Sequence, residues 1–141
     1  MQGQPGHFYI IYVAVYVFII YFYYGMEKIE TEELLHKSAW NDWIIISISG
    51  RFTVQNILRV KTFLNAFMRD SDIKIGIDLS KTTYLDSSAI TILLNFHRRC
   101  SEKNGKVVLF GLAPDIEAIL SIVGIDKIVK TVKTIEDLTT M

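Results

Sequence analysis

Residues 26–141 alternate between short apolar runs and longer stretches in which apolar residues recur every third or fourth position. Apolar runs that end at a glycine or a polar turn are typical of buried strands. Strong runs of this kind predict strands at 43–49, 73–79 and 106–110. Two weaker runs predict edge strands at 32–40 and 127–132, the first joined to residues 43–49 by a turn at Asn41-Asp42.

Between these strands, apolar residues recur with the spacing of a helix. Val54 and Leu58 belong to the apolar positions of the first such stretch, and residues 80–86 are expected to form a loop. The pattern predicts four helices: from Thr53 as N-cap to about residue 70, from Asp86 to about Lys103 with Gly105 as the stop, from Pro114 to Gly124, and a short one opened by the capping-box sequence at 134–137.

The order of these elements determines the expected fold class. Strands that alternate with helices of about 10–17 residues predict an α/β fold. We expect one mixed, partly parallel sheet of about four or five strands, packed with about four helices. A chain of 141 residues fits one such domain.

An apolar leader precedes the domain. Residues 8–24 contain no charged residue, glycine or proline, and all 15 basic and 15 acidic residues lie after Gly25. We therefore divide the chain into a leader at 1–25 and a domain at 26–141. As a helix, the segment would be about 25 Å long, a little less than the roughly 30 Å hydrocarbon core of a bilayer. Six of its residues are tyrosines, which are spread along it rather than gathered at its ends.

Three interpretations of the leader stay open. Its length and lack of charge favour a single membrane anchor, with membrane contact through residues 8–24. It is alternatively a non-native extension with Met26 as the working start, because the composition of an ordinary globular domain begins there. In the third interpretation it is a strand or helix packed on the domain. We expect a cytoplasmic protein, anchored to a membrane only in the first case.

Charge and composition exclude several functional classes. Basic and acidic residues balance to a formal net charge of zero, which argues against direct binding of nucleic acid. The single cysteine excludes an intrachain disulfide, and the three histidines lack metal-ligand spacing. The sequence also lacks the phosphate-binding, nucleophile-elbow and zinc-protease motifs of common enzymes. We therefore expect no catalysis, no metal and no cofactor.

Isolated reactive side chains have structural explanations. His36 lies in a predicted edge strand, where a solvated imidazole is expected. His97 is in line with the apolar face of its helix, and Cys100 follows as a small, partly buried residue. Trp40 and Trp43 flank a predicted turn and are interpreted as packing residues.

One polar cluster, Asp86-Ser87-Ser88-Ala89, lies between a strand and a helix. Ligands and modifications collect in the loops that follow strands of an open α/β sheet. The cluster also fits a helix cap, because Asp and Ser accept hydrogen bonds from the first free N–H groups. A phosphate on Ser87 would add about two negative charges, which the helix N-terminus would tolerate and a docked partner would not. Both interpretations of the cluster, a helix cap and a phosphorylation switch, stay open.

Residues 73–90, IKIGIDLSKTTYLDSSAI, resemble the central signature of STAS domains, above all the anti-sigma factor antagonists of bacteria. That signature is a strand ending in D-L-S, a short loop, and D-S-S-G/A at the start of a helix. The stretches GKVVLFGL at 105–112 and ILSIVGI at 119–125, with Pro114 between them, are similar to the family's next strand and Pro-led helix.

Upstream, Ser49-Gly50 followed by the helix from Thr53 resembles the end of the family's first core strands. This sequence departs from the family at two places. Arg51-Phe52-Thr53 stands where the family often has an acidic, a hydrophobic and an Asp residue, and Ala89 replaces the commoner glycine.

The resemblance implies a binding module with no catalysis of its own. In such antagonists, the serine after the motif aspartate is phosphorylated by a partner that is both serine kinase and anti-sigma factor. That serine is Ser87 here, with Ser88 as the second choice. The unphosphorylated protein would bind this partner and free a sigma factor for transcription, and a serine phosphatase would reset it. ATP would be the kinase's substrate rather than a cofactor of this chain. The expected motif and partner interface is Asp86, Ser87, Ser88, Ala89, Gly50, Arg51 and Thr53.

A function of a different class also stays open. The chain would then be a STAS interaction module in a membrane transport or other signalling assembly, without phosphoswitching. The leader would place the domain at a bilayer, and Ser87 would act only as a helix cap.

Overall fold

The computed structural model describes residues 9–20 and 34–141, and the chain divides into two units, Met1–Glu32 and Glu33–Met141. In the first unit, residues 9–20 form a helix. Tyr9, Tyr12 and Tyr16 are three and four residues apart and so share one helical face, on which the rings of the last two stack with centroids 6.4 Å apart.

The leader hypotheses concern residues that are only partly described. Among the described helices, none combines the length and the apolar character needed to cross a membrane. The remainder of the segment at 8–24, and Met26, lie outside the described residues. The three interpretations of the leader and the domain boundary at residue 26 therefore stay predictions.

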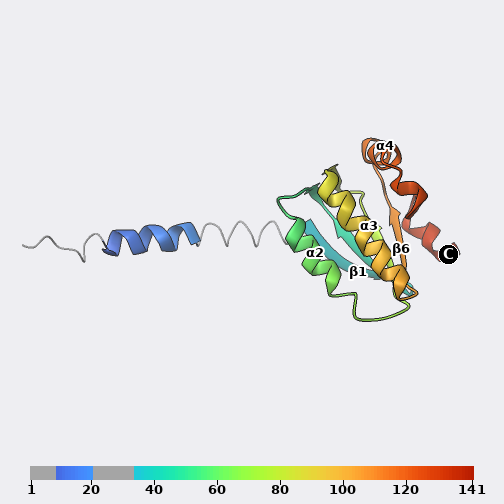
Figure 1. Ribbon diagram of the computed structural model, residues 1–141, viewed down its shortest axis with the longest axis horizontal. Coiled ribbons are helices and arrows are strands. Elements are labelled where there is room, and N and C mark those ends of the chain that lie inside the picture. The colour runs from blue at the N-terminus through green and yellow to red at the C-terminus, as the bar shows by residue number, and fades with distance from the viewer. Residues whose placement is uncertain (1–8, 21–33) are drawn as a thin grey trace, which may run out of the picture. The chain divides into compact units, whose positions relative to one another are not determined.

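The second unit is built on a five-stranded sheet with the order β1-β2-β4-β6-β7 (Figure 1). The first pair is antiparallel and the other neighbours are parallel, which confirms the predicted mixed, partly parallel sheet. Its strands are β1 (Leu35–Trp40), β2 (Trp43–Ile48), β4 (Lys74–Asp78), β6 (Lys106–Phe110) and β7 (Lys130–Val132).

Helices cover both faces of this sheet. Pro114 occupies the first turn of its helix and Gly124 follows that helix with a φ of 78°, both as the sequence predicts. The capping box at Thr134 and Asp137 is also present, and it opens a 3-10 helix. The helices are α2 (Ile57–Asn65), α3 (Ser87–Glu102), α4 (Pro114–Ile122), η1 (Ile125–Lys127) and η2 (Ile135–Thr140).

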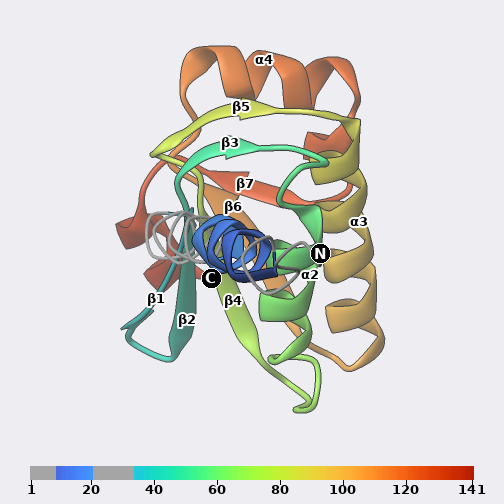
Figure 2. The same cartoon turned by 90° about the vertical axis from the view of Figure 1, so that its left-hand side faces the viewer.

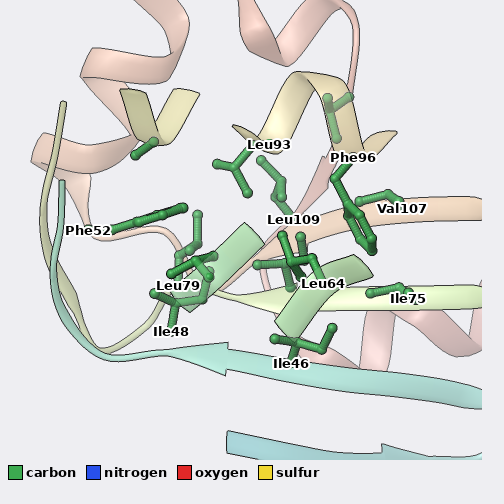
Figure 3. Close-up of a cluster of buried hydrophobic side chains, with 14 of the residues drawn as sticks. Ile46, Ile48, Phe52, Leu64, Ile75, Leu79, Leu93, Phe96, Val107 and Leu109 are labelled. Carbon is green, nitrogen blue, oxygen red and sulfur yellow. The ribbon is translucent and has the colours of Figure 1, made fainter. Parts of the chain in front are cut away.

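Alternating side chains of the strands form two hydrophobic cores. The larger core lies between the sheet and helices α2, α3 and α4 (Figure 3), and includes Ile46, Ile75, Leu109, Leu64 and Leu93. The smaller core lies on the opposite face beneath η2, and consists of Trp43, Ile45, Val108, Phe110 and Leu138.

Gly76 of β4 makes room for the smaller core. A Cβ at this position would lie 2.9 Å from Ile45 Cδ1 and 3.0 Å from Leu138 Cδ1. Cβ atoms rarely approach other atoms so closely, so a side chain here would force the ends of the Ile45 and Leu138 side chains to shift.

The expectation of a loop over residues 80–86 was wrong. These residues contain β5 (Thr82–Leu85), which pairs in parallel with β3 (Gly50–Phe52) in a separate two-stranded sheet. Figure 2 shows the two strands side by side, β3 leading toward α2 and β5 leading into α3. Each strand is too short to give a period of its own, and its partner lies about thirty residues away, so the pattern of a single segment does not reveal it.

The expectation that Thr53 is the N-cap of the first helix was also wrong. Residues 53–56 form a turn, and the N-cap of α2 is Asn56, whose Oδ1 accepts a hydrogen bond from Thr53 N–H at 3.0 Å. The later start leaves Val54 and Leu58 63% and 74% exposed, while the buried residues of α2 are Val60 and Leu64. The apolar stripe of the real helix is thus narrower than the sequence pattern suggests.

The end of α3 differs from its prediction by one residue. Asn104, with a φ of 62°, occupies the left-handed position that Gly105 was expected to take. The N–H groups of Asn104 and Gly105 donate to the carbonyl oxygens of Ser101 and Cys100, at 3.0 and 2.7 Å. This is the Schellman pattern of helix termination. Glycine is needed at position 105 for another reason. A Cβ atom there would lie 2.9 Å from the Ile73 carbonyl oxygen, which is too close.

Candidate functional site

Asp86 caps α3 and ties this helix to the turn before α2. Its Oδ1 accepts a hydrogen bond from Ala89 N–H at 3.0 Å, and its Oδ2 accepts one from Val54 N–H at 2.8 Å. Partial burial raises the pKa of the carboxyl group, but the hydrogen bonds from backbone N–H groups outweigh this effect and hold the pKa of Asp86 below its ordinary value. The residue is therefore a carboxylate at neutral pH, with its charge directed at backbone amides.

The pairing of β3 with β5 brings two distant parts of the expected interface together. Arg51 lies opposite Tyr84 in this pair, and Phe52 lies opposite Leu85. Asp86 N–H also donates to the Phe52 carbonyl oxygen at 3.3 Å. The stretch from Gly50 to Thr53 therefore lies beside the start of α3, although the two are more than thirty residues apart in the sequence.

The serines occupy the first turn of α3 with different exposure. Ser87 is exposed, Ser88 is half-buried, and Ala89 is fully buried in the larger core. The N-cap is formed by the Asp86 side chain, so the Ser87 hydroxyl is not required for capping. Ala89, which replaces the commoner glycine of the family, has only a methyl group to bury there.

Exposed apolar side chains lie on the segments next to this helix start. Val54, whose N–H donates to Asp86, is 63% exposed, and Leu58 follows four residues later at 74%. On the other side, Tyr84 is 41% exposed, and the Arg51 guanidinium lies over its ring at 4.4 Å from the centroid. Large apolar side chains exposed next to one another are typical of binding surfaces.

The exposure of this apolar surface was not expected from the sequence, because Val54 and Leu58 fall among the apolar positions of a helical pattern. A signal was present in the spacing. Ile57, Val60 and Leu64 are three and four residues apart and make a complete stripe by themselves. Leu58 is displaced from that stripe by about 100° around the helix.

The other reactive residues lie apart from this surface. His36 is exposed on β1, as expected. Cys100 is fully buried in the larger core, where desolvation raises the pKa of its thiol to about 11, so it is protonated and inert at neutral pH. Trp43 is buried in the smaller core, and Trp40 packs against it. Within residues 9–20 and 34–141, no three His, Cys, Asp or Glu side chains cluster as metal ligands would.

Comparisons with known proteins agree with this fold. The family model described as the STAS domain matches residues 35–138. The Anti-sigma-B factor antagonist of Listeria monocytogenes is 25% identical over 100 residues, which are 71% of this chain and 87% of that protein.

Two solved structures are similar in fold. An anti-sigma factor antagonist from Mycobacterium paratuberculosis aligns with a TM-score of 0.68 and 21% identity, over 75% of this chain and 90% of that one. The Bacillus cell fate determinant SpoIIAA in its phosphorylated form aligns with a TM-score of 0.59 and 12% identity, over 75% and 96% of the two chains.

Proposed function

The chain belongs to the STAS domain family, and from this premise we propose that it is an anti-sigma factor antagonist that is switched off by phosphorylation at Ser87. The observation that carries the proposal is the position of Ser87, which is exposed at the first residue of α3 and is not needed for the helix cap. The name of the Listeria relative supports the antagonist role, and favours it over the alternative of a module in a membrane transport assembly.

In the proposed mechanism, the unphosphorylated protein binds a partner that is both anti-sigma factor and serine kinase, and so frees a sigma factor. The kinase transfers a phosphate from its own ATP to Ser87, and a serine phosphatase removes it. This chain acts by binding in the cytoplasm, without catalysis, a cofactor or direct contact with nucleic acid. The solved structure of SpoIIAA in its phosphorylated form supports the proposal that this fold can carry a phosphate.

The surroundings of Ser87 explain how a phosphate would act. The apolar side chains of Val54, Leu58 and Tyr84 form the surface on which we propose that the partner docks. A phosphate adds about 1.5 to 2 negative charges beside the ionised Asp86. The N-terminus of α3 tolerates this charge, because its dipole has its positive end there. A partner that must desolvate the same surface is repelled, so binding is lost while the domain stays folded.

Phosphosite mapping tests the modification directly. The protein is purified from its native cells under several growth conditions, and its intact mass is measured with and without phosphatase treatment. We expect one phosphate on Ser87 that phosphatase removes. An unmodified chain under every condition, or a phosphate only on Ser88, would contradict the proposed switch.

Partner binding tests its consequence. Ser87→Ala should bind the anti-sigma factor as tightly as the unphosphorylated wild type, and Ser87→Asp should bind roughly tenfold or more weakly, because it places a charge in the apolar surface. Ser101→Ala, at an exposed position at the other end of α3, is the matched control and should leave affinity unchanged. Equal affinity for Ser87→Ala, Ser87→Asp and wild type would refute the switch.

A further inference from the structure

A second site lies on a different part of the domain from Ser87. An open cavity of about 840 Å³ is formed where the beginning of β6 meets β7 and the end of η2. Its lining combines the cationic residues Lys106, Lys130 and Lys133 with apolar residues such as Val107 and Ile128. A volume of this size is within the range of small-molecule sites, about 300–1,000 Å³.

The lining of the cavity carries more positive than negative charge. All three lysines are exposed, and none of them forms an ion pair within 4 Å with a carboxylate of the described residues. Asp137 also lines the cavity, but its carboxylate accepts hydrogen bonds from Thr134 N–H and Oγ1 at 2.9 and 3.2 Å. The first of these bonds is the main cause of its lowered pKa. The Asp137 carboxylate stays ionised, so the lining carries three positive charges against one negative charge.

His97 of α3 also lines the cavity. Its Nδ1 is fully buried and has no hydrogen-bond partner among the described residues, so this atom faces protein rather than the open cavity. The ring is therefore a reporter of ligand binding, and the lysines are the groups that can bind an anion.

We propose that this cavity binds a small amphipathic organic anion. Its oxyanion group, a carboxylate, sulfonate or phosphate, is bound by the lysines. Its apolar body packs against Ile128 and Val132, which are both at least partly exposed in the lining. None of the lining residues belongs to the Ser87 surface, so this site is separate from the proposed switch and can be tested without it.

Titration of the full-length, isotope-labelled protein with 1-naphthalenesulfonate, followed by NMR, tests the site. We expect saturable shifts of the amide signals of β6 and β7 and of the His97 ring signals. The uncharged analogue 1-naphthalenemethanol should bind about tenfold or more weakly, because it lacks the charge that the lysines bind. Shifts that do not saturate, or that map only to other residues, would refute the site.

Paired lysine variants separate this site from general attraction of an anion to a cationic surface. Lys130→Gln with Lys133→Gln should weaken sulfonate binding roughly tenfold, and both residues are exposed, so the fold should be unaffected. Lys61→Gln with Lys81→Gln removes the same charge from exposed positions elsewhere and should have little effect. If the two double variants weaken binding equally, the cavity is not a specific site. Its lysines then only keep the edge strand β7 solvent-exposed and unpaired.

Discussion

At the scale of single residues, Asp86 connects two helices through one carboxylate. One oxygen caps α3 through Ala89 N–H, and the other holds the turn before α2 through Val54 N–H. Loss of the side chain would release both helix starts together. The residue next to the proposed phosphorylation site therefore has a structural reason to be an aspartate, whatever its part in partner binding.

The lowered pKa of Asp86 predicts a pH-dependent contribution to stability. Because the folded state holds this pKa below the ordinary value of 3.8, the ionised carboxylate stabilises the fold above that pH. The contribution is lost as the pH falls through the folded-state pKa. At neutral pH, we expect Asp86→Ala to lower the free energy of unfolding by about 1–2 kcal/mol, and Asp86→Asn by less because its amide oxygen still accepts a hydrogen bond.

Urea unfolding over a range of pH checks this prediction. The difference between wild type and Asp86→Ala should be constant near neutral pH and should shrink in acid. Ser87→Ala is the matched control, because it changes no titratable group, and its difference from wild type should not vary with pH. A difference for Asp86→Ala that persists unchanged in strong acid would show that the charge of Asp86 does not stabilise the fold.

At the scale of elements, the helix ends are set by interactions with distant segments. The end of α3 is an example: Asn104 turns the chain with a φ of 62°, and its side-chain Nδ2 donates to Asp72 Oδ1 at 2.7 Å. This contact fastens the end of α3 to the chain before β4. The apolar strand pattern at 73–79 and the helical pattern of α3 can both be recognised in the sequence. The hydrogen bond between Asn104 and Asp72 cannot.

Two substitutions at Asn104 separate its backbone role from its side-chain role. Both Asn104→Ala and Asn104→Gly lose the hydrogen bond to Asp72, but only alanine is strained at a positive φ. We expect alanine to be less stable than glycine by about 1 kcal/mol, measured as the difference in free energy of unfolding in urea. Equal stability of the two variants would mean that the left-handed backbone at this position costs alanine nothing.

At the scale of the whole molecule, two cores share one sheet. The larger is covered by three helices, and the smaller is closed by η2 at the end of the described chain. Gly76 and Leu138 meet in the smaller core. Because Gly76 has no side chain, there is space for the side chain of Leu138. The cationic cavity shares Val108 of β6 and Val132 of β7 with this core, and η2 borders both.

Removal of the Leu138 side chain tests how much the second core contributes. Leu138 is 1% exposed, so Leu138→Ala should lower the free energy of unfolding by roughly 2–4 kcal/mol through lost burial and an unfilled cavity. Leu58→Ala is the matched control, since Leu58 is 74% exposed and should cost less than about 0.5 kcal/mol. A small loss for Leu138→Ala would mean that η2 does not stabilise the domain.

Elements with a strong local pattern could be predicted from sequence. The strands at 43–49, 73–79 and 106–110, the helix from Pro114 and the capping box at 134–137 all appear in the structure, with shifts of one or two residues at their ends. Their periodicity and terminal residues are properties of consecutive positions, so they can be derived without knowledge of the fold. The polar cluster from Asp86 to Ala89 could be located for the same reason.

Only the tertiary structure decided how these elements complete a site. The pairing of β3 with β5 and the hydrogen bond from Val54 to Asp86 join residues about thirty positions apart. The turn before Asn56 places Val54 outside α2, and the cavity lysines come from distant parts of the chain. A local sequence pattern shows which side of a segment is apolar. It does not show which other segment packs against that side, because this depends on many long-range contacts that the whole chain must satisfy together.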